Sequence, residues 1–287
     1  MTDIEKRSGP ARGRRRTPAG GSRRAARPPA TPTLVGRPLA AAGGMFALML
    51  DTARATFRRP FAWREMIQQA WFLASVTILP TALVSIPFGA VIALQLGSVT
   101  RQLGAQAYTG SAAVLAVIRE ASPIVTALLI AGAGGSAICA DLGARKIRDE
   151  IDAMEVLGIN PIQRLVVPRV LGCMVVAFLL NGLVSVVGVM GGYFFNVIMQ
   201  GGTPGAYLAS FNALAQLPDL MISEFKAVIY GFIAGVVAAY RGLNPSAGPK
   251  GVGDAVNQAV VITFLLLFLV NVVLTGIYLQ LVPPKGM

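Results

Sequence analysis

The residues of this chain that could do chemistry in water gather in one short segment near its middle. The segment RKIRDEIDAMEVLGINPIQR, residues 145–164, holds four of the 13 acidic residues and four of the 25 basic ones. Residues 121–140 and 170–218, on either side, contain no Asp, Glu, Lys or Arg. A segment this short and this charged cannot span a bilayer, so we expect it to lie in water between two apolar regions.

The rest of the sequence offers little to an enzyme. Histidine, the commonest metal ligand and general base, is absent from the 287 residues. Cys139 and Cys173 lie in different apolar segments without a metal-ligand or CxxC spacing, and we expect both to be packing residues. The glycine-rich stretches AGAGGSA and GPKGVG lack the lysine–hydroxyl pair of a phosphate-binding loop. We therefore predict no catalytic residue, metal site or cofactor in this chain, so any ATPase must be another chain.

Composition and charge spacing predict a membrane protein. Hydrophobic residues make up 54% of the chain and charged residues 13%, against about 25% charged residues in a typical soluble domain. A bilayer core roughly 30 Å thick needs about 20 apolar residues per helical span. We expect an all-α membrane protein whose residues 66–284 form one five-helix domain. The spans are expected within residues 66–97 and near residues 111–142, 165–200, 220–240 and 255–282.

Two segments precede the first span. Residues 1–37 hold ten of the 25 Lys and Arg residues among Pro, Gly and Ala, and we expect a disordered basic tail attracted to anionic lipid headgroups. A nucleic-acid-binding arm is the alternative. Residues 38–65 are expected to hold an amphipathic helix lying in the headgroup plane. Its apolar face carries Phe46 and Leu50 and its basic face Arg54, and a helix packed on the bundle is the alternative.

The placement of Lys and Arg in short loops predicts how the chain lies in the membrane. A cytoplasmic N-terminus puts the basic tail, the charged segment before the third span, and the loop with Arg241 and Lys250 on one side. The opposite side then holds Arg101 and Lys285. We expect a multi-pass protein of the plasma (inner) membrane, with the N-terminus in the cytoplasm and the C-terminus on the outer side.

The charged segment itself has a helical period over residues 146–158. The expected apolar face consists of Ile147, Ile151, Met154, Leu157 and Gly158, and the opposite face of Arg148, Asp152 and Glu155. Gly158 and Pro161 mark the end of the helix. Glu150 lies beside the apolar face, where a carboxylate needs a cation or a hydrogen-bond donor. Periodicity alone leaves two interpretations open, a solvated connector and a docking helix for a cytoplasmic partner.

Four charged residues lie in or near the predicted spans: Arg119, Glu120, Glu224 and Lys226. Such residues usually face the protein interior and pair with one another. Glu224 and Lys226 are two positions apart and point in different directions on a helix. We therefore expect Arg119 or Glu120 to pair across helices with Glu224 or Lys226. The alternative is that these side chains reach the outer headgroups.

The first predicted span is our candidate for the wall of a lipid path. Pro80 and Pro87 predict a bent or broken helix there, which is tolerated where neighbours or cavities satisfy the freed carbonyl groups. The candidate lining residues are Leu79, Pro80, Leu83, Ile86, Pro87, Phe88 and Ile92. Most of these side chains could instead face the membrane lipid.

Several stretches of the sequence resemble one known family. They occur in the order FRRPFAWRE, REASPIVTALLIAGAGGSAICADLG, ICADLGARKIRDEIDAMEVLGINPIQRLVVPRVLG, KAVIYGFIAGVVAAYRG and GPKGVGDAVNQAVV. These motifs resemble the MlaE/YrbE permeases, which are membrane subunits of Mce-associated lipid-transporting ABC systems, and look closest to the actinobacterial YrbE branch. The chain departs from the pattern in the second span. Many relatives have an arginine where it reads Ala131-Gly132-Ala133-Gly134.

The resemblance implies an architecture and a set of partners. Such permeases have an N-terminal interfacial helix, five membrane helices, and a cytoplasmic coupling helix between the second and third membrane helices. Two permease subunits, typically different YrbE paralogues in this branch, bind two cytoplasmic ATPase subunits, which hold ATP and Mg. Mce-domain proteins lie on the outer side. The motif assigns to the coupling helix and its continuation Glu150, Asp152, Ala153, Leu157, Gly158, Pro161, Pro168 and Arg169; we add Arg148 and Glu155 from the same predicted helix.

The function implied by the resemblance is non-catalytic. The chain would be a permease subunit of an ATP-driven transporter that imports fatty acids, mycolic acids or sterols across the cell envelope. Two other classes of function remain open from the residues. An ion-coupled secondary transporter would use the intramembrane charges and need no ATPase. A structural anchor for an Mce assembly would need no ATPase contact for its activity.

Overall fold

The computed structural model describes residues 36–56, 62–105, 108–199, 201–205, 207–209 and 216–281. The basic tail expected at residues 1–37 lies almost wholly outside the described residues. Residues 40–287 form a compact unit of their own, distinct from residues 1–39, and all contacts described below are within it. The described residues of this unit are helical and contain no strand, so the predicted all-α fold is confirmed.

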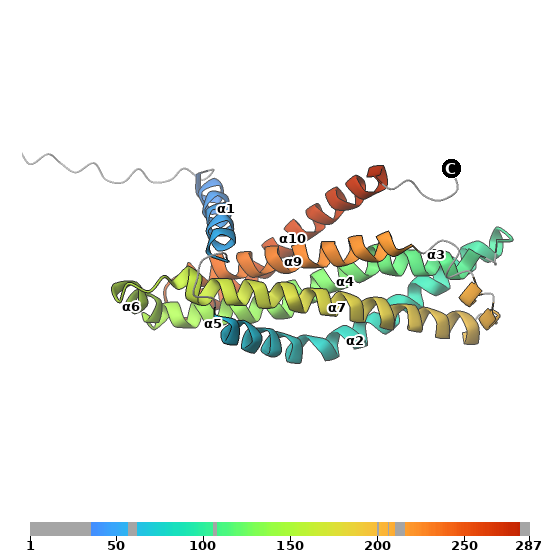
Figure 1. Cartoon of the computed structure of the whole chain (residues 1–287), viewed down its shortest axis with the longest axis horizontal. Helices are drawn as coiled ribbons and strands as arrows, with labels where there is room; N and C mark the ends of the chain where they lie inside the picture. The colour runs from blue at the N-terminus through green and yellow to red at the C-terminus, as the bar shows by residue number, and fades with distance from the viewer. Residues whose placement is uncertain are drawn as a thin grey trace, which may run out of the picture. The chain divides into compact units, whose positions relative to one another are not determined.

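Five helical segments of the described chain are long and apolar enough to cross a membrane. They are Trp63–Gln102, Thr109–Ile147, Ile162–Met199, Leu217–Leu243 and Gly248–Leu281. The first is helix α2, the fourth is α9 and the fifth is α10 (Figure 1). Each is longer than the predicted span at one or both ends, because the charged and polar residues that bounded the predictions continue the helices beyond the apolar runs.

The second span is interrupted by π-helical turns, and the third begins and ends with one. The second consists of α3 (Thr109–Ala116), η2 (Val117–Ala121), α4 (Ser122–Leu129), η3 (Ile130–Gly134) and α5 (Gly135–Ile147). The third consists of η4 (Ile162–Val166), α7 (Val167–Phe194) and η5 (Phe195–Met199). A π turn inserts one residue and re-aims the side chains around it, and such turns are frequent at functional sites. The η2 turn carries Arg119 and Glu120.

Helix α2 runs unbroken through Pro80 and Pro87, so the first span is not split in two. Figure 1 shows that it changes direction along its length. Proline removes a backbone donor and clashes with the preceding turn, which bends a helix. The buried Thr77, Thr81 and Ser85 side chains add to this, because each donates a hydrogen bond to the carbonyl group four residues earlier, at 2.7, 2.6 and 2.5 Å.

Helix α1 (Gly36–Thr56) is shorter than the range 38–65 expected for the interfacial helix, and Trp63–Glu65 belong to α2. Leu48, Thr52 and Ala55 are buried against the bundle. Phe46 and Leu50, from the predicted apolar face, are 61% and 41% exposed. One face of α1 therefore packs on the bundle, while these two apolar side chains remain on the outside.

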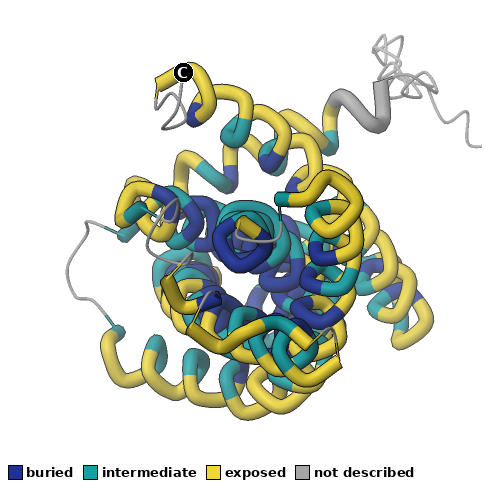
Figure 2. Tube along the Cα trace, turned by 90° about the vertical axis from the view of Figure 1, so that its right-hand side faces the viewer, coloured by how far each residue is buried: buried dark blue, intermediate teal, exposed yellow. Residues whose placement is uncertain are grey.

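The helices turn their small residues toward one another, and Figure 2 shows the buried residues between them and the exposed ones outside. A Cβ atom added at Gly89 of α2 would lie 2.1 Å from the backbone oxygen of Gly188 in α7. At Gly231 of α9 it would lie 2.8 Å from the Cys173 oxygen of α7. The helices thus approach closely at Gly188 and Gly231, whereas nothing lies within 4 Å of a Cβ atom added at Gly132.

We predict that Gly89→Ala destabilises the bundle. The added methyl group meets backbone rather than a movable side chain, so α2 and α7 must separate, at an overpacking cost of about 1–3 kcal/mol. The measurement is the unfolding temperature of the detergent-solubilised protein. Gly276→Ala in α10 is the matched control, because nothing lies within 4 Å of its Cβ position. Equal unfolding temperatures for both variants would contradict the close contact.

Candidate functional site

The charged segment between the second and third spans forms a shorter helix than the sequence predicted. Helix α6 covers Glu150–Val156, whereas Lys146 and Ile147 are the end of α5. The predicted helix over residues 146–158 is therefore wrong at its start. The break lies at Asp149, whose backbone is left-handed with φ 58°. Asp tolerates this conformation better than most residues, but no glycine or proline marks the break in the sequence.

The end of α6 lies where the sequence placed it. Gly158 has φ 74°. The Ile159 N–H donates to the Met154 carbonyl at 2.9 Å, and the Gly158 N–H donates to the Glu155 carbonyl at 3.0 Å. These bonds close the helix in the usual glycine-terminated way and satisfy carbonyl groups that the last turn leaves open.

Helix α6 packs on the core through Ile151 and Met154 and exposes other apolar side chains. Ile151 is 2% exposed and belongs to the hydrophobic core, and Met154 packs against that core. The predicted apolar face is not buried as a whole, because Leu157 is 75% exposed and Ile147 is 37% exposed. Val156, outside the predicted set, is 89% exposed. The last turn of α6 therefore presents two adjacent apolar side chains that the bundle does not cover.

The charges around α6 form pairs across its junction with α5. The Glu150 carboxylate accepts a hydrogen bond from Arg148 Nε at 2.8 Å and lies 3.7 Å from Arg145 Nη1. Lys146 pairs with Asp152 across the same junction. Glu150, whose place beside the apolar face required a partner, therefore has two cations. Of the residues that continue the segment, Pro168 and Arg169 are buried near the start of α7.

The intramembrane charges lie at one level of the bundle. Lys226 of α9 is fully buried, and its Nζ atom lies 3.6 Å from Glu120 Oε1 of η2. The same ammonium group donates to Thr275 Oγ1 of α10 at 2.7 Å and to the Arg119 carbonyl at 3.2 Å. The pair expected across the helices is thus the one between Glu120 and Lys226. The Lys226 ammonium group of the fourth span therefore contacts both the second and the fifth spans.

A second pair at this level involves a residue that the sequence reading missed. Arg119 Nη2 lies 2.5 Å from Asp219 Oδ1, and the Tyr278 hydroxyl donates to the same carboxylate at 2.6 Å. Asp219 stands one residue before the predicted fourth span and is absent from the predicted site residues, but it lies in the first turn of α9. Glu224 does not join either pair, and its Oε2 atom is buried without a hydrogen-bond partner among the described residues.

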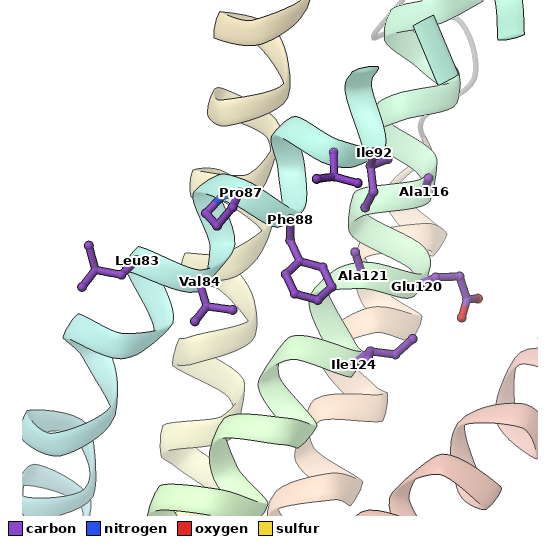
Figure 3. A pocket seen from close by; sticks show the side chains of 10 residues that line it. Leu83, Val84, Pro87, Phe88, Ile92, Ala116, Glu120, Ala121 and Ile124 are labelled. Carbon is purple, nitrogen blue, oxygen red and sulfur yellow. The ribbon is translucent and has the colours of Figure 1, made fainter. Parts of the chain in front are cut away.

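An apolar pocket of about 680 Å³ opens between α2 and the second span. It is lined by Leu83, Val84, Pro87, Phe88, Val91, Ile92, Ala116, Glu120, Ala121 and Ile124. Figure 3 shows Val84 and the Phe88 ring projecting from α2 toward the second span, whereas Leu83 and the Glu120 carboxylate point away from the space between the two helices. The walls that face the pocket are therefore almost entirely hydrocarbon.

The sequence identified four of the ten residues that line this pocket. Leu83, Pro87, Phe88 and Ile92, all predicted, line it, whereas Leu79, Pro80 and Ile86 do not. Leu79 and Pro80 lie one helical turn before Leu83 and Val84, the first lining residues in α2, and both are exposed. Ile86 points to another side of the helix, where its backbone faces Gly191 of α7. The wall from the second span was missed because no single helix reveals which neighbour it packs against.

We predict that the Glu120–Lys226 pair is energetically coupled. Glu120→Gln leaves a buried ammonium group without its carboxylate, and Lys226→Met leaves a carboxylate that is 38% exposed, so the first variant loses more stability. The double variant removes both charges and should be more stable than the sum of the single losses implies, by about 0.5–3 kcal/mol. Thermal unfolding in detergent measures all three variants, with Asp254→Asn, an exposed carboxylate of α10, as the control. Strict additivity would contradict the pairing.

Comparison with known proteins places this architecture in a family. The sequence model of the family named Permease MlaE matches residues 66–277, which include all or part of every membrane helix. A probable ABC transporter permease protein of Rickettsia typhi is 31% identical over 81% of this chain and 90% of its own length. One from Synechocystis is 34% identical over 67% of this chain and 73% of its own. The chloroplastic protein TRIGALACTOSYLDIACYLGLYCEROL 1 of Arabidopsis thaliana is 28% identical over 76% and 62%. The chain belongs to the MlaE permease family.

Proposed function

We propose that this permease subunit moves lipids or other strongly hydrophobic molecules through the membrane, driven by a separate ATPase chain. The observation that carries the proposal is the hydrocarbon-walled pocket between α2 and the second span. Substrates of the fatty acid, mycolic acid or sterol class, and import across the cell envelope, are the specific form of the proposal. ATP and Mg belong to the ATPase partner.

The pocket suits the apolar part of a lipid. Its volume of about 680 Å³ falls within the roughly 300–1,000 Å³ of typical ligand sites. Burial of apolar surface contributes about 25 cal/mol per Å², without regard to direction. A charged headgroup placed against these walls would lose its hydration and gain no partner, because the Glu120 carboxylate faces Lys226 instead. Binding would therefore depend on the hydrocarbon part of the substrate.

The proposed entry point for the energy of ATP hydrolysis is α6. Val156 and Leu157 are exposed at its end, next to a helix face that is otherwise charged. We propose that these two side chains insert into a groove of the ATPase. A second permease of the YrbE type and Mce-domain proteins on the outer side complete the proposed assembly, as the sequence resemblance to the actinobacterial branch implies. Two bacterial relatives are named as probable ABC transporter permeases, which supports the ATPase partner.

A second candidate function rests on the intramembrane charges. The pairs Glu120–Lys226 and Arg119–Asp219 could serve as coupling groups of an ion-driven transporter. That function would require transport without an ATPase and would give α6 no task. A structural anchor for an Mce assembly would need neither α6 as a docking helix nor the pocket. An ATP-driven permease would use both α6 and the pocket, and we therefore prefer this function.

We predict that Val156→Asp disrupts binding of the ATPase. The substitution places a charge on a side chain that is 89% exposed, so the fold is unaffected, but the apolar contact is lost. Recovery of a phosphate-binding-loop ATPase with the affinity-purified permease should fall at least tenfold, measured by mass spectrometry. Glu150→Lys, which puts a cation beside Arg145 and Arg148, should act in the same direction. Asp254→Lys in α10 is the control for an exposed charge change.

The outcome that would contradict this docking is recovery of equal ATPase with the Val156→Asp variant and with the wild type. Purification of the wild-type permease without any ATPase would favour the ion-driven transporter or the anchor.

We predict that filling the pocket blocks transport and leaves the complex assembled. Ala121→Phe projects a ring toward Phe88 and occupies space that a lipid chain would need. Uptake of radiolabelled palmitate and cholesterol by cells that carry the whole complex should fall about tenfold for whichever probe the wild type imports. Ser75→Phe, on an exposed position of α2 outside the pocket, is the matched control. Unchanged uptake in the Ala121→Phe variant would remove the pocket from the transport path.

A further inference from the structure

We infer that Asp141 is the positioning residue that links the motion of α6 to the membrane helices. A chain of ion pairs runs from Arg148 through Glu150 and Arg145 to Asp141, and Asp141 joins this chain to Arg169 of α7. The inference rests on the proposed function, because it assigns to this chain the transfer of the movement that the ATPase imposes on α6. Neither Asp141 nor Arg145 was among the site residues identified from the sequence.

The junction between α5 and α6 is short, and two ion pairs join the helices across it. Arg148 and Asp149 alone separate the end of α5 at Ile147 from the start of α6 at Glu150. Arg145 of α5 reaches Glu150 at 3.7 Å, and Lys146 of α5 pairs with Asp152. Because the junction is only two residues long and Ile151 anchors α6 in the core, we expect α6 to move together with the end of α5, and the two ion pairs favour the same arrangement.

Asp141 then joins α5 to the third span. It lies one helical turn before Arg145, and its Oδ1 atom accepts a hydrogen bond from Arg145 Nε at 3.2 Å. Its Oδ2 atom pairs with Arg169 Nη2 of α7. One carboxylate thus holds a cation of the α6 junction with one oxygen and a cation of the next membrane helix with the other.

Arg169 makes this link hard to release. Its side chain is 4% exposed, and its Nη1 atom donates to the Leu165 carbonyl at 2.8 Å within the same span. A buried guanidinium group is costly unless a carboxylate meets it, so α7 follows Asp141 rather than parting from it. The Asp141–Arg169 pair therefore behaves as a fixed point between α5 and α7.

From this fixed point the movement has a route to the pocket. Helix α7 contacts α2 at Gly188 and Gly191, which face the backbones of Gly89 and Ile86. Gly89 follows Phe88, a lining residue of the pocket. These contacts are between backbones and cannot be taken up by side-chain rotation. A shift of α6 would therefore reach the α2 wall of the pocket through α5 and α7, with Asp141 as the joint (Figure 1).

The experiment measures transport per ATP hydrolysed by the whole complex, with its co-purified ATPase, in liposomes loaded with radiolabelled palmitate or cholesterol. The double variant Asp141→Asn with Arg169→Gln removes the link and leaves no buried unpaired charge, so it folds even if Asp141→Asn alone does not. We expect it to retain the ATPase and to hydrolyse ATP, but to move about tenfold less lipid per ATP. Arg145→Gln, a half-exposed substitution, should lower the ratio about threefold.

A merely structural role for the Asp141–Arg169 pair makes a different prediction. If the pair is merely structural, the neutral double variant should recover the wild-type ratio of lipid moved to ATP hydrolysed. That result would overturn the inference. So would a wild-type ratio for Arg145→Gln. Asp254→Asn is the control and should keep the ratio. A wild-type complex that contains no ATPase would instead refute the proposed function, and the inference with it.

Discussion

The close backbone contact between α2 and α7 is the constraint on which the rest of the bundle depends. Helices surrounded by lipid gain little from burying apolar side chains, so their association relies on tight packing and on polar contacts. Gly89 and Gly188 bring the two backbones together where any larger residue would collide. The bend in α2 accompanies this contact, and the part of α2 that lies nearest to α7 carries Phe88 at the pocket wall. The two glycines therefore fix the position of the α2 wall of the pocket.

Charged pairs fix the other helices at two levels. At one level, Glu120 and Arg119 of η2 bind Lys226 and Asp219 of α9, and Thr275 and Tyr278 of α10 complete the hydrogen bonds. At the other level, Asp141 of α5 binds Arg169 of α7. Each pair joins helices that are far apart in sequence, and each cation is costly to expose to hydrocarbon. The pocket lies beside Glu120, at the level of the first pairs, and its other lining residues are apolar, so a lipid chain can be accommodated there without competing for these contacts.

The sequence predicted the features that follow from long apolar runs and from the need to pair charge. Five spans, the end of α6 at Gly158 and the partnership of Glu120 with Lys226 all follow from those two rules. Other features depend on how helices meet. The left-handed Asp149, the π turn that carries Glu120, and Asp219 as the partner of Arg119 have no local signal, because Asp residues and loop ends like these occur in many conformations. The pocket wall formed by the second span could not be predicted either, because it too depends on how the helices meet.

The two levels of charge also suggest a division of labour within one small bundle. A pocket with hydrocarbon walls selects by size and apolar area and gives little directional preference, so it tolerates a family of related substrates. Directed movement must then come from outside the pocket, through contacts stiff enough to carry it. The two-residue junction and the buried Ile151 hold α6 to α5, with two ion pairs favouring the same arrangement, and backbone contact at the glycines holds α7 against α2. In the proposed function, substrate binding and force transfer therefore use different chemistry, and substitutions in the pocket should alter the first without weakening the second.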